Sequence, residues 1–181
     1  MSLYGAWDPP RPGWVCSECG LAYDATPVAE AGEMLAALVP EFEQRLTMSP
    51  GRLRTRPDSS TWSALEYACH VRDCLALYHW RISTVLAEDR PEMPPMRRDA
   101  VVLERAYNDQ EPAAVGAEIT ANYMRLAHLL GRLAPADWQR AGVREGVDLS
   151  VAWMAVNTVH ELRHHLKDID EVLVKTAPRL P

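Results

Sequence analysis

Histidine and carboxylate side chains are concentrated in one short segment near the C-terminal end of this 181-residue sequence. Three histidines, His160, His164 and His165, lie close together there and enclose Glu161. A further histidine, His70, lies far away in a largely apolar stretch. Imidazole and carboxylate groups together suit Zn, Ni, Fe or Mn, and such a site needs no thiolate. We therefore expect a divalent metal ion, with zinc as the first choice, between the two segments.

Two pairs of residues in this segment have the spacing of a helical metal site. Side chains four residues apart on a helix lie on one face, close enough to bind one ion. His160 and His164 form one such pair, and Glu161 and His165 form the other. Spacing alone leaves either pair open as the partner of His70.

Helical phase favours the second pair. A helix turns by about 100° per residue, and the apolar stripe that should face the other helices consists of Ala155, Val159, Leu162, Leu166, Ile169 and Leu173. His164 falls opposite this stripe, toward solvent, whereas Glu161 and His165 flank it along one edge, which Asp168 continues. The predicted ligands are therefore His70, Glu161 and His165. Asp168, His160 and His164 are expected next to these ligands, without binding the ion themselves. The pair of His160 and His164 stays an alternative.

A second feature with metal-binding chemistry is the knuckle Cys16-Ser17-Glu18-Cys19-Gly20. Two cysteines separated by two residues and followed by glycine resemble half of a zinc ribbon. A closed zinc site needs four ligands, and the other two cysteines, Cys69 and Cys74, lie within a helical pattern that should bury them. We interpret Cys16 and Cys19 as a metal-binding pair, a redox pair or free thiols in an ordered turn. A metal half-site would need ligands from a neighbouring subunit or from residues other than cysteine.

Apolar residues at helical spacing predict four long helices, which cover about residues 27–48, 62–88, 112–133 and 149–175. Loops separate them, and no segment shows convincing strand alternation. This order of elements predicts an all-α fold, a four-helix bundle. We assign the bundle to residues 27–181. Residues 1–26 hold several prolines and glycines without periodicity, and they form an irregular N-terminal arm around the cysteine knuckle.

The connections between these helices carry weaker signals. Residues 49–60 are polar and basic and are expected to form a loop. Residues 134–149 hold short valine-containing runs on either side of Arg144-Glu145-Gly146, which suits a small hairpin or a plain loop. Ser60 or Thr61 is expected to cap the second long helix.

Charge and composition exclude several functional classes. The net charge is −6 and no block of Lys and Arg follows one face, so nucleic acid is not an expected partner. No stretch of about 18 apolar residues occurs, so we expect no membrane span. Residues 1–7 lack a charged segment followed by an apolar run, so we expect no signal peptide and a cytoplasmic protein.

The order of these features resembles the DinB/YfiT-like superfamily. Trp62 precedes His70 by eight residues, and an acid-x-x-x-His pair follows in the last helix. Residues 155–169 resemble the last-helix motif of that family, in which the final ligand His is followed by two residues, a polar one and an apolar one. That His corresponds to His165, and the first ligand of the last helix then falls on Glu161. A Glu at this position is also the arrangement in the mycothiol-dependent maleylpyruvate isomerases, which are distant relatives.

The resemblance covers about residues 27–175 and implies a four-helix bundle that binds a metal through three protein ligands. Relatives of known activity are isomerases or S-transferases that use thiols such as mycothiol or bacillithiol, and related bundles often form homodimers. The resemblance therefore implies a divalent-metal-dependent enzyme for a small-molecule substrate or thiol, acting by S-transfer, isomerisation or hydrolysis. The alternative is a non-catalytic metal-binding helical module.

Overall fold

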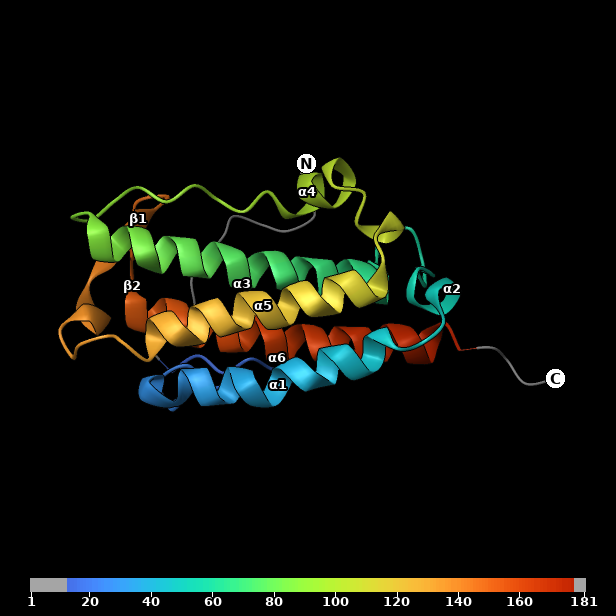
Figure 1. The fold of residues 1–181 in the computed structure, drawn as a ribbon, viewed down its shortest axis with the longest axis horizontal. Helices are drawn as coiled ribbons and strands as arrows, with labels where there is room; N and C mark the ends of the chain where they lie inside the picture. The colour runs from blue at the N-terminus through green and yellow to red at the C-terminus, as the bar shows by residue number, and fades with distance from the viewer. Residues whose placement is uncertain (1–12, 178–181) are drawn as a thin grey trace.

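Four long helices dominate the computed structural model, which describes residues 13–177. They are α1 (Ala31–Leu46), α3 (Ala64–Ala87), α5 (Pro112–Leu130) and α6 (Val151–Lys175). All four run along the long axis of the molecule (Figure 1). Helix α3 packs against α5 and α6, and α1 packs against the same two helices. The predicted all-α four-helix bundle is therefore confirmed, and the described residues add to it a small two-stranded sheet and several short helices.

A capping box begins α3, the helix that carries His70. The hydroxyl of Ser63 accepts a hydrogen bond from the backbone N–H of Glu66 (3.2 Å), and the Glu66 carboxylate accepts one from the N–H of Ser63 (2.8 Å). The prediction that Ser60 or Thr61 caps this helix is wrong. The N–H groups of these two residues donate instead to the carboxylate of Asp58, which holds the turn that precedes the helix.

The stripe that was predicted for the last helix faces the interior of the bundle. Leu162, Leu166, Ile169 and Leu173 are all buried. The helix begins after Ser150, whose hydroxyl accepts a hydrogen bond from the N–H of Trp153 (3.0 Å). A polar N-cap and a continuous apolar stripe thus fix both the start and the rotation of α6.

The structure also contains short helices, which are η1 (Val28–Glu30), α2 (Pro50–Leu53), α4 (Arg98–Glu104), η2 (Tyr107–Asp109) and η3 (Asp137–Gln139). The prediction of a loop over residues 49–60 is wrong in part, because α2 occupies its first third. Pro50 suits the first turn of a helix, and Leu53 is fully buried. One helical turn is too short to produce a periodic pattern in the sequence.

A hairpin occupies the connection between α5 and α6, which settles the choice between hairpin and loop. It consists of β1 (Ala141–Arg144) and β2 (Val147–Ser150), which pair in antiparallel fashion at one end of the bundle (Figure 1). Glu145 and Gly146 form the turn with φ of 51° and 81°. Two positive φ angles characterise the tight turn that suits the twist of a hairpin, and glycine adopts them readily.

The arm that precedes η1 packs on the bundle. Leu21 and Tyr23 are buried and belong to the same hydrophobic core as the helices. Residues 1–12 lie outside the described residues, and so does the segment on which the absence of a signal peptide was predicted. Within residues 13–177 no helix is long and apolar enough to cross a bilayer.

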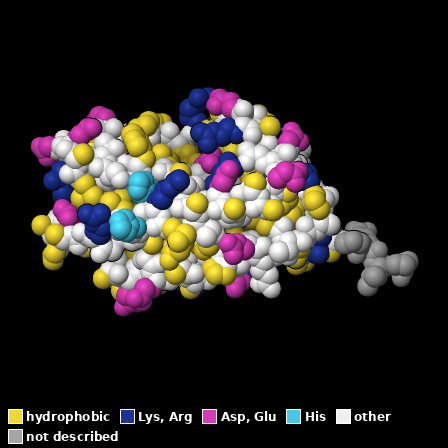
Figure 2. Space-filling model, viewed as in Figure 1, with side chains coloured by type: hydrophobic (Ala, Val, Ile, Leu, Met, Phe, Trp, Pro, Cys, Tyr) yellow, Lys and Arg dark blue, Asp and Glu magenta, His cyan; other side chains and the backbone are white. Residues whose placement is uncertain are grey.

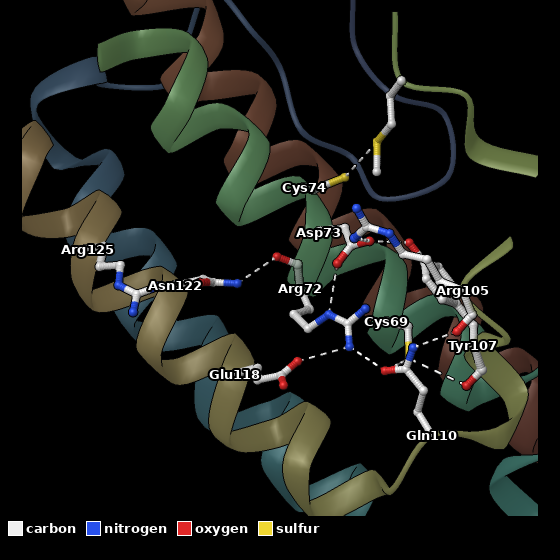
Figure 3. Close-up of polar contacts among 11 residues, drawn as sticks. Cys69, Arg72, Asp73, Cys74, Arg105, Tyr107, Gln110, Glu118, Asn122 and Arg125 are labelled. Atoms are coloured by element: carbon white, nitrogen blue, oxygen red, sulfur yellow. Dashed lines mark hydrogen bonds and ion pairs between the residues drawn. The ribbon is translucent and has the colours of Figure 1, made fainter. Parts of the chain in front are cut away.

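A polar network fastens the segment after α4 to the side of α3 (Figure 3). Arg72 donates to Asp73 (2.8 Å) and, across to α5, to Glu118 (3.0 Å). Asp73 also accepts hydrogen bonds from Arg105 and from the hydroxyl of Tyr107. The network fixes α3 against its neighbours on the side that faces α5. On the face seen in Figure 2, by contrast, acidic and basic side chains lie intermixed with hydrophobic ones.

Candidate metal centre

Two neighbouring helices, α3 and α6, bring together the three side chains predicted as metal ligands. His70 projects from α3, and Glu161 and His165 project from successive turns of α6. The Nε2 of His70 lies 3.4 Å from Glu161 Oε2, and the Nε2 of His165 lies 3.3 Å from the same oxygen. The two imidazole rings meet edge to face, with 4.8 Å between their centroids. Glu161 Oε2 therefore lies between the two ring nitrogens, whereas the three ligand atoms here that lie within 4.8 Å of one another belong to His70, Glu161 and Cys74.

Burial and hydrogen bonding set the charges of these groups. His70 is 1% exposed, and its burial lowers the pKa of the imidazole, so this ring is neutral at pH 7. Burial disfavours the charged form of Glu161, but hydrogen bonds with His165 and His70 outweigh it and hold the pKa of the carboxyl well below its usual range. A neutral imidazole and an ionised carboxylate are the forms that bind metal.

Asp168 lies behind His165 and orients it. The Nδ1 of His165 donates to Asp168 Oδ2 at 2.7 Å, which turns its Nε2 toward Glu161. Burial alone would lower the pKa of His165, but the hydrogen bonds to Asp168 and Glu161 raise it to about 9. Unlike His70, this imidazole is therefore protonated at pH 7 and must lose a proton to bind an ion. A carboxylate that holds the far nitrogen of a ligand imidazole fixes the ring and increases its basicity. The sequence analysis predicts a supporting role for Asp168, and this hydrogen bond is the contact through which it would act.

Two aromatic rings flank the histidines. The ring of Trp62 lies 5.4 Å from that of His70, and the ring of Tyr67 lies 5.4 Å from that of His165. Both aromatic residues pack against the hydrophobic core while staying partly exposed. They are the apolar neighbours against which the two imidazoles pack.

Cys74 is a residue of this site that the sequence analysis missed. It lies one turn after His70 on α3, and its Sγ is 3.3 Å from His70 Nε2 and 3.8 Å from Glu161 Oε2. Cys69, with which it was grouped, turns away, and its Sγ lies 3.7 Å from the carbonyl oxygen of Tyr107. The missed signal is the four-residue spacing of His70 and Cys74, which is the same spacing that identified the pairs of the last helix.

Polar side chains connect the arm to this cluster. Asn157, one turn before Glu161, donates to Glu161 Oε1 at 3.4 Å. Its carbonyl oxygen accepts a hydrogen bond from the hydroxyl of Tyr23, and its amide also donates to the hydroxyl of Tyr78. Burial is the main cause that raises the pKa of both tyrosines, so their hydroxyls stay neutral. The arm thus contributes directly to the surroundings of Glu161, which no feature of the sequence indicated.

The donor set fits a divalent cation. Two imidazoles and one carboxylate on facing helices of a bundle are the ligand types that Zn, Ni, Fe and Mn accept. The Nδ1 of His70 is buried without a hydrogen-bond partner among residues 13–177, so Nε2 is the nitrogen that faces Glu161 and Cys74. His70, Glu161 and His165 would hold the ion and leave a coordination position for a further ligand.

The other two histidines of the last helix lie in a separate cluster with the arm. Cys16, Cys19, His160 and His164 each offer a ligand atom, and these four atoms lie within 4.8 Å of one another. The phase estimate that pointed His164 toward solvent is corrected, because its side chain is only 22% exposed and contacts Cys16. Helical phase describes one helix in isolation, whereas the aperiodic arm covers this face of α6. His164 Nε2 also lies 3.7 Å from Asp168 Oδ2, so the two clusters adjoin.

Comparison with known proteins agrees with this architecture. A family profile described as the DinB superfamily matches residues 34–169, so the resemblance inferred from the sequence motifs is confirmed. YfiT from Bacillus subtilis, described as a probable metal-dependent hydrolase with an unusual four-helix bundle topology, superposes with a TM-score of 0.75 and 18% identity, covering 93% of this chain and 92% of that one. The mycothiol-dependent maleylpyruvate isomerase superposes with a TM-score of 0.61 and 14% identity, covering 86% and 70% respectively. At these identities the likeness concerns the fold. No curated protein matches the sequence.

Proposed function

We propose that this chain, which belongs to the DinB superfamily, is a divalent-metal-dependent enzyme whose ion is held by His70, Glu161 and His165. The observation that carries the proposal is the convergence of two Nε2 atoms on one oxygen of Glu161, at 3.4 and 3.3 Å. The carboxylate of Asp168 behind His165 supports it, because ligand histidines are commonly oriented in this way.

Three protein ligands leave an open position on a four-coordinate ion. The ion would act as a Lewis acid and lower the pKa of a water or thiol bound in that position. The chain itself orients the ligands through Asp168 and Asn157, and it packs the rings of Trp62 and Tyr67 against the two imidazoles. No cysteine of the chain is needed as a nucleophile.

The reaction that fits such a site is an attack by an activated water or small thiol on a small-molecule substrate. One structural relative is described as a probable metal-dependent hydrolase and the other as a mycothiol-dependent isomerase. For this chain we propose either hydrolysis by an activated water, or a transfer or isomerisation that uses a low-molecular-weight thiol such as mycothiol. We place the activity in the cytoplasm.

A second candidate function rests on Cys74. Its Sγ lies 3.3 Å from the ligand nitrogen of His70, close enough to become a fourth ligand after a small shift. A saturated four-coordinate ion has no position for a substrate and would be structural. In that case the protein would be a non-catalytic metal-binding module.

Metal analysis of the purified wild type and four variants separates these functions. The wild type should hold an ion that His70→Ala and Glu161→Gln lose, whereas Cys74→Ala should keep it. Cys69→Ser is the matched control for cysteine substitution, because Cys69 is buried on the same helix and contacts Tyr107 instead. Loss of the ion in Cys74→Ala would favour the closed module. An ion content unaffected by His70→Ala would overturn the proposed centre.

An activity screen completes the test. Chromogenic ester and amide substrates probe hydrolysis, and an electrophile such as monobromobimane with mycothiol probes thiol transfer. We expect turnover that requires added metal and falls below detection in His70→Ala and Glu161→Gln, while Cys69→Ser retains it. Turnover that persists in metal-free protein would contradict a metal-dependent mechanism.

A further inference from the structure

The cysteine knuckle of the arm has the backbone of a metal-binding turn. Val15 and Ala22 form an antiparallel bridge that closes it, and the N–H of Gly20 donates to the carbonyl oxygen of Cys16 at 2.8 Å. Gly20 has a φ of +70°, a conformation that a side chain would strain. The tight turn brings the ligand atom of Cys19 within 4.8 Å of that of Cys16. Both cysteines are free thiols.

Two imidazoles of α6 face this knuckle. His160 and His164 lie four residues apart and project from the same side of the helix, with ring centroids 5.2 Å apart. The Sγ of Cys16 lies 3.5 Å from His164 Nδ1. Each imidazole has a ligand atom within 4.8 Å of both thiols. These distances are somewhat longer than those across an occupied zinc site, so a small contraction around an ion would complete the coordination.

His160 carries an independent sign of a missing partner. Its Nε2 is buried and has no hydrogen-bond partner in the described part of the chain. Aromatic rings hold the imidazole on two sides, with Trp14 at 5.4 Å and Tyr23 at 5.5 Å. A buried polar nitrogen without a partner is costly, and a bound cation would satisfy it.

We propose that these two thiols and two imidazoles bind a second ion, Zn²⁺, in a closed tetrahedral site formed by Cys16, Cys19, His160 and His164. Two sulfur and two nitrogen ligands are a combination typical of structural zinc. The thiols bind as thiolates, so two protons pass to solvent when the ion binds. All four coordination positions are filled by the chain, and the ion therefore has a structural role.

The proposed zinc fastens the N-terminal arm to α6 beside the first metal centre. Tyr23 follows the knuckle closely, and its hydroxyl bonds to Asn157, the neighbour of Glu161. The knuckle and the two histidines come from opposite ends of the chain, so an ion between them restricts a long loop of sequence. The arm then acts as a fixed wall of the first centre.

Metal stoichiometry tests the second site separately from the first. The wild type should bind two ions per chain, and Cys16→Ser/Cys19→Ser should bind one. His70→Ala should also bind one, and combining the three substitutions should leave none. The Cys69→Ser control should keep both ions. If Cys16→Ser/Cys19→Ser binds as many ions as the wild type, the second site is refuted, whatever the result for His70→Ala.

Spectroscopy identifies the ligands of the second ion directly. X-ray absorption at the zinc edge of His70→Ala, in which only the second site is filled, should show two sulfur and two nitrogen neighbours. Single substitutions His160→Ala and His164→Ala should each weaken zinc binding at least tenfold in chelator competition. A sulfur-only or sulfur-free ligand shell, or a Cys16–Cys19 disulfide found by alkylation and mass spectrometry of wild type purified without reductant, would overturn the proposal.

Discussion

Asp168 shows how a single residue outside the ligand set can control the proposed centre. Its carboxylate accepts the hydrogen bond of His165 Nδ1, so it fixes which nitrogen faces Glu161. Its own pKa is lowered despite burial, chiefly because His165 hydrogen-bonds to it. The carboxylate is therefore ionised at every pH at which His165 is neutral and can bind an ion.

We predict that Asp168→Asn weakens metal binding at the first centre by about 10- to 100-fold without removing a ligand, as is common for such supporting carboxylates. Chelator competition in the Cys16→Ser/Cys19→Ser background would measure this ion alone. Asp170→Asn is the control, because Asp170 lies two residues away and pairs with Arg45 on the surface. Equal affinities for Asp168→Asn and Asp170→Asn would rule out an orienting role.

The capped start of α3 sets the position of His70, which lies two turns further along this helix. Ser63 caps the helix and also donates a hydrogen bond to Asn108, so it links the helix start to the segment after α4. We predict that Ser63→Ala lowers the free energy of unfolding by about 1–2 kcal/mol, because it removes a cap and leaves buried polar groups unpaired. Denaturant unfolding would measure the loss. The exposed neighbour Ser59 is the control, and a similar loss in Ser59→Ala would contradict the assignment of the cap.

The turn before α3 should also respond to pH. Hydrogen bonds from the side chain and N–H of Ser60 and from Thr61 lower the pKa of Asp58 to about 2. Its pKa in the unfolded chain is about 3.9, so the stabilisation is present above that value and is lost as pH falls through about 2. An NMR titration of the Asp58 carboxyl should give the lowered value, and Ser60→Ala should move it upward. A pKa near that of the unfolded chain would show that these hydrogen bonds to Asp58 do not form.

Across the whole molecule, the spacing of apolar residues predicted the four long helices, because each of these helices buries one stripe of apolar side chains. The same phase reasoning selected Glu161 and His165 in the last helix, which the bundle brings next to His70. It could not place His164, because the arm that covers that residue has no period and its packing depends on contacts between the two ends of the chain. Cys74 was not predicted for a different reason. It was considered as a further ligand for the cysteine knuckle, and its four-residue spacing from His70 was not used.

The two proposed ions join α3, α6 and the arm in one assembly. Removal of metal should therefore lower the stability of the whole chain. An ion present at roughly 1,000 times its dissociation constant stabilises the folded state by about 4 kcal/mol. For a chain of this size each kcal/mol corresponds to about 2–4 °C in Tm, so each ion should raise Tm by about 8–16 °C.

Thermal unfolding with zinc and with chelator would measure these shifts in the wild type, in Cys16→Ser/Cys19→Ser and in His70→Ala. Each variant should lose one of the two increments. In addition, chelator should expose the arm to proteolysis in the wild type and in His70→Ala, because the second ion is the one that the arm itself binds. The zinc-saturated Cys16→Ser/Cys19→Ser variant should be cleaved in the arm without chelator. An arm that stays protected in that variant would mean that the packing of Leu21 and Tyr23 alone holds it, and that the second ion is not what attaches it.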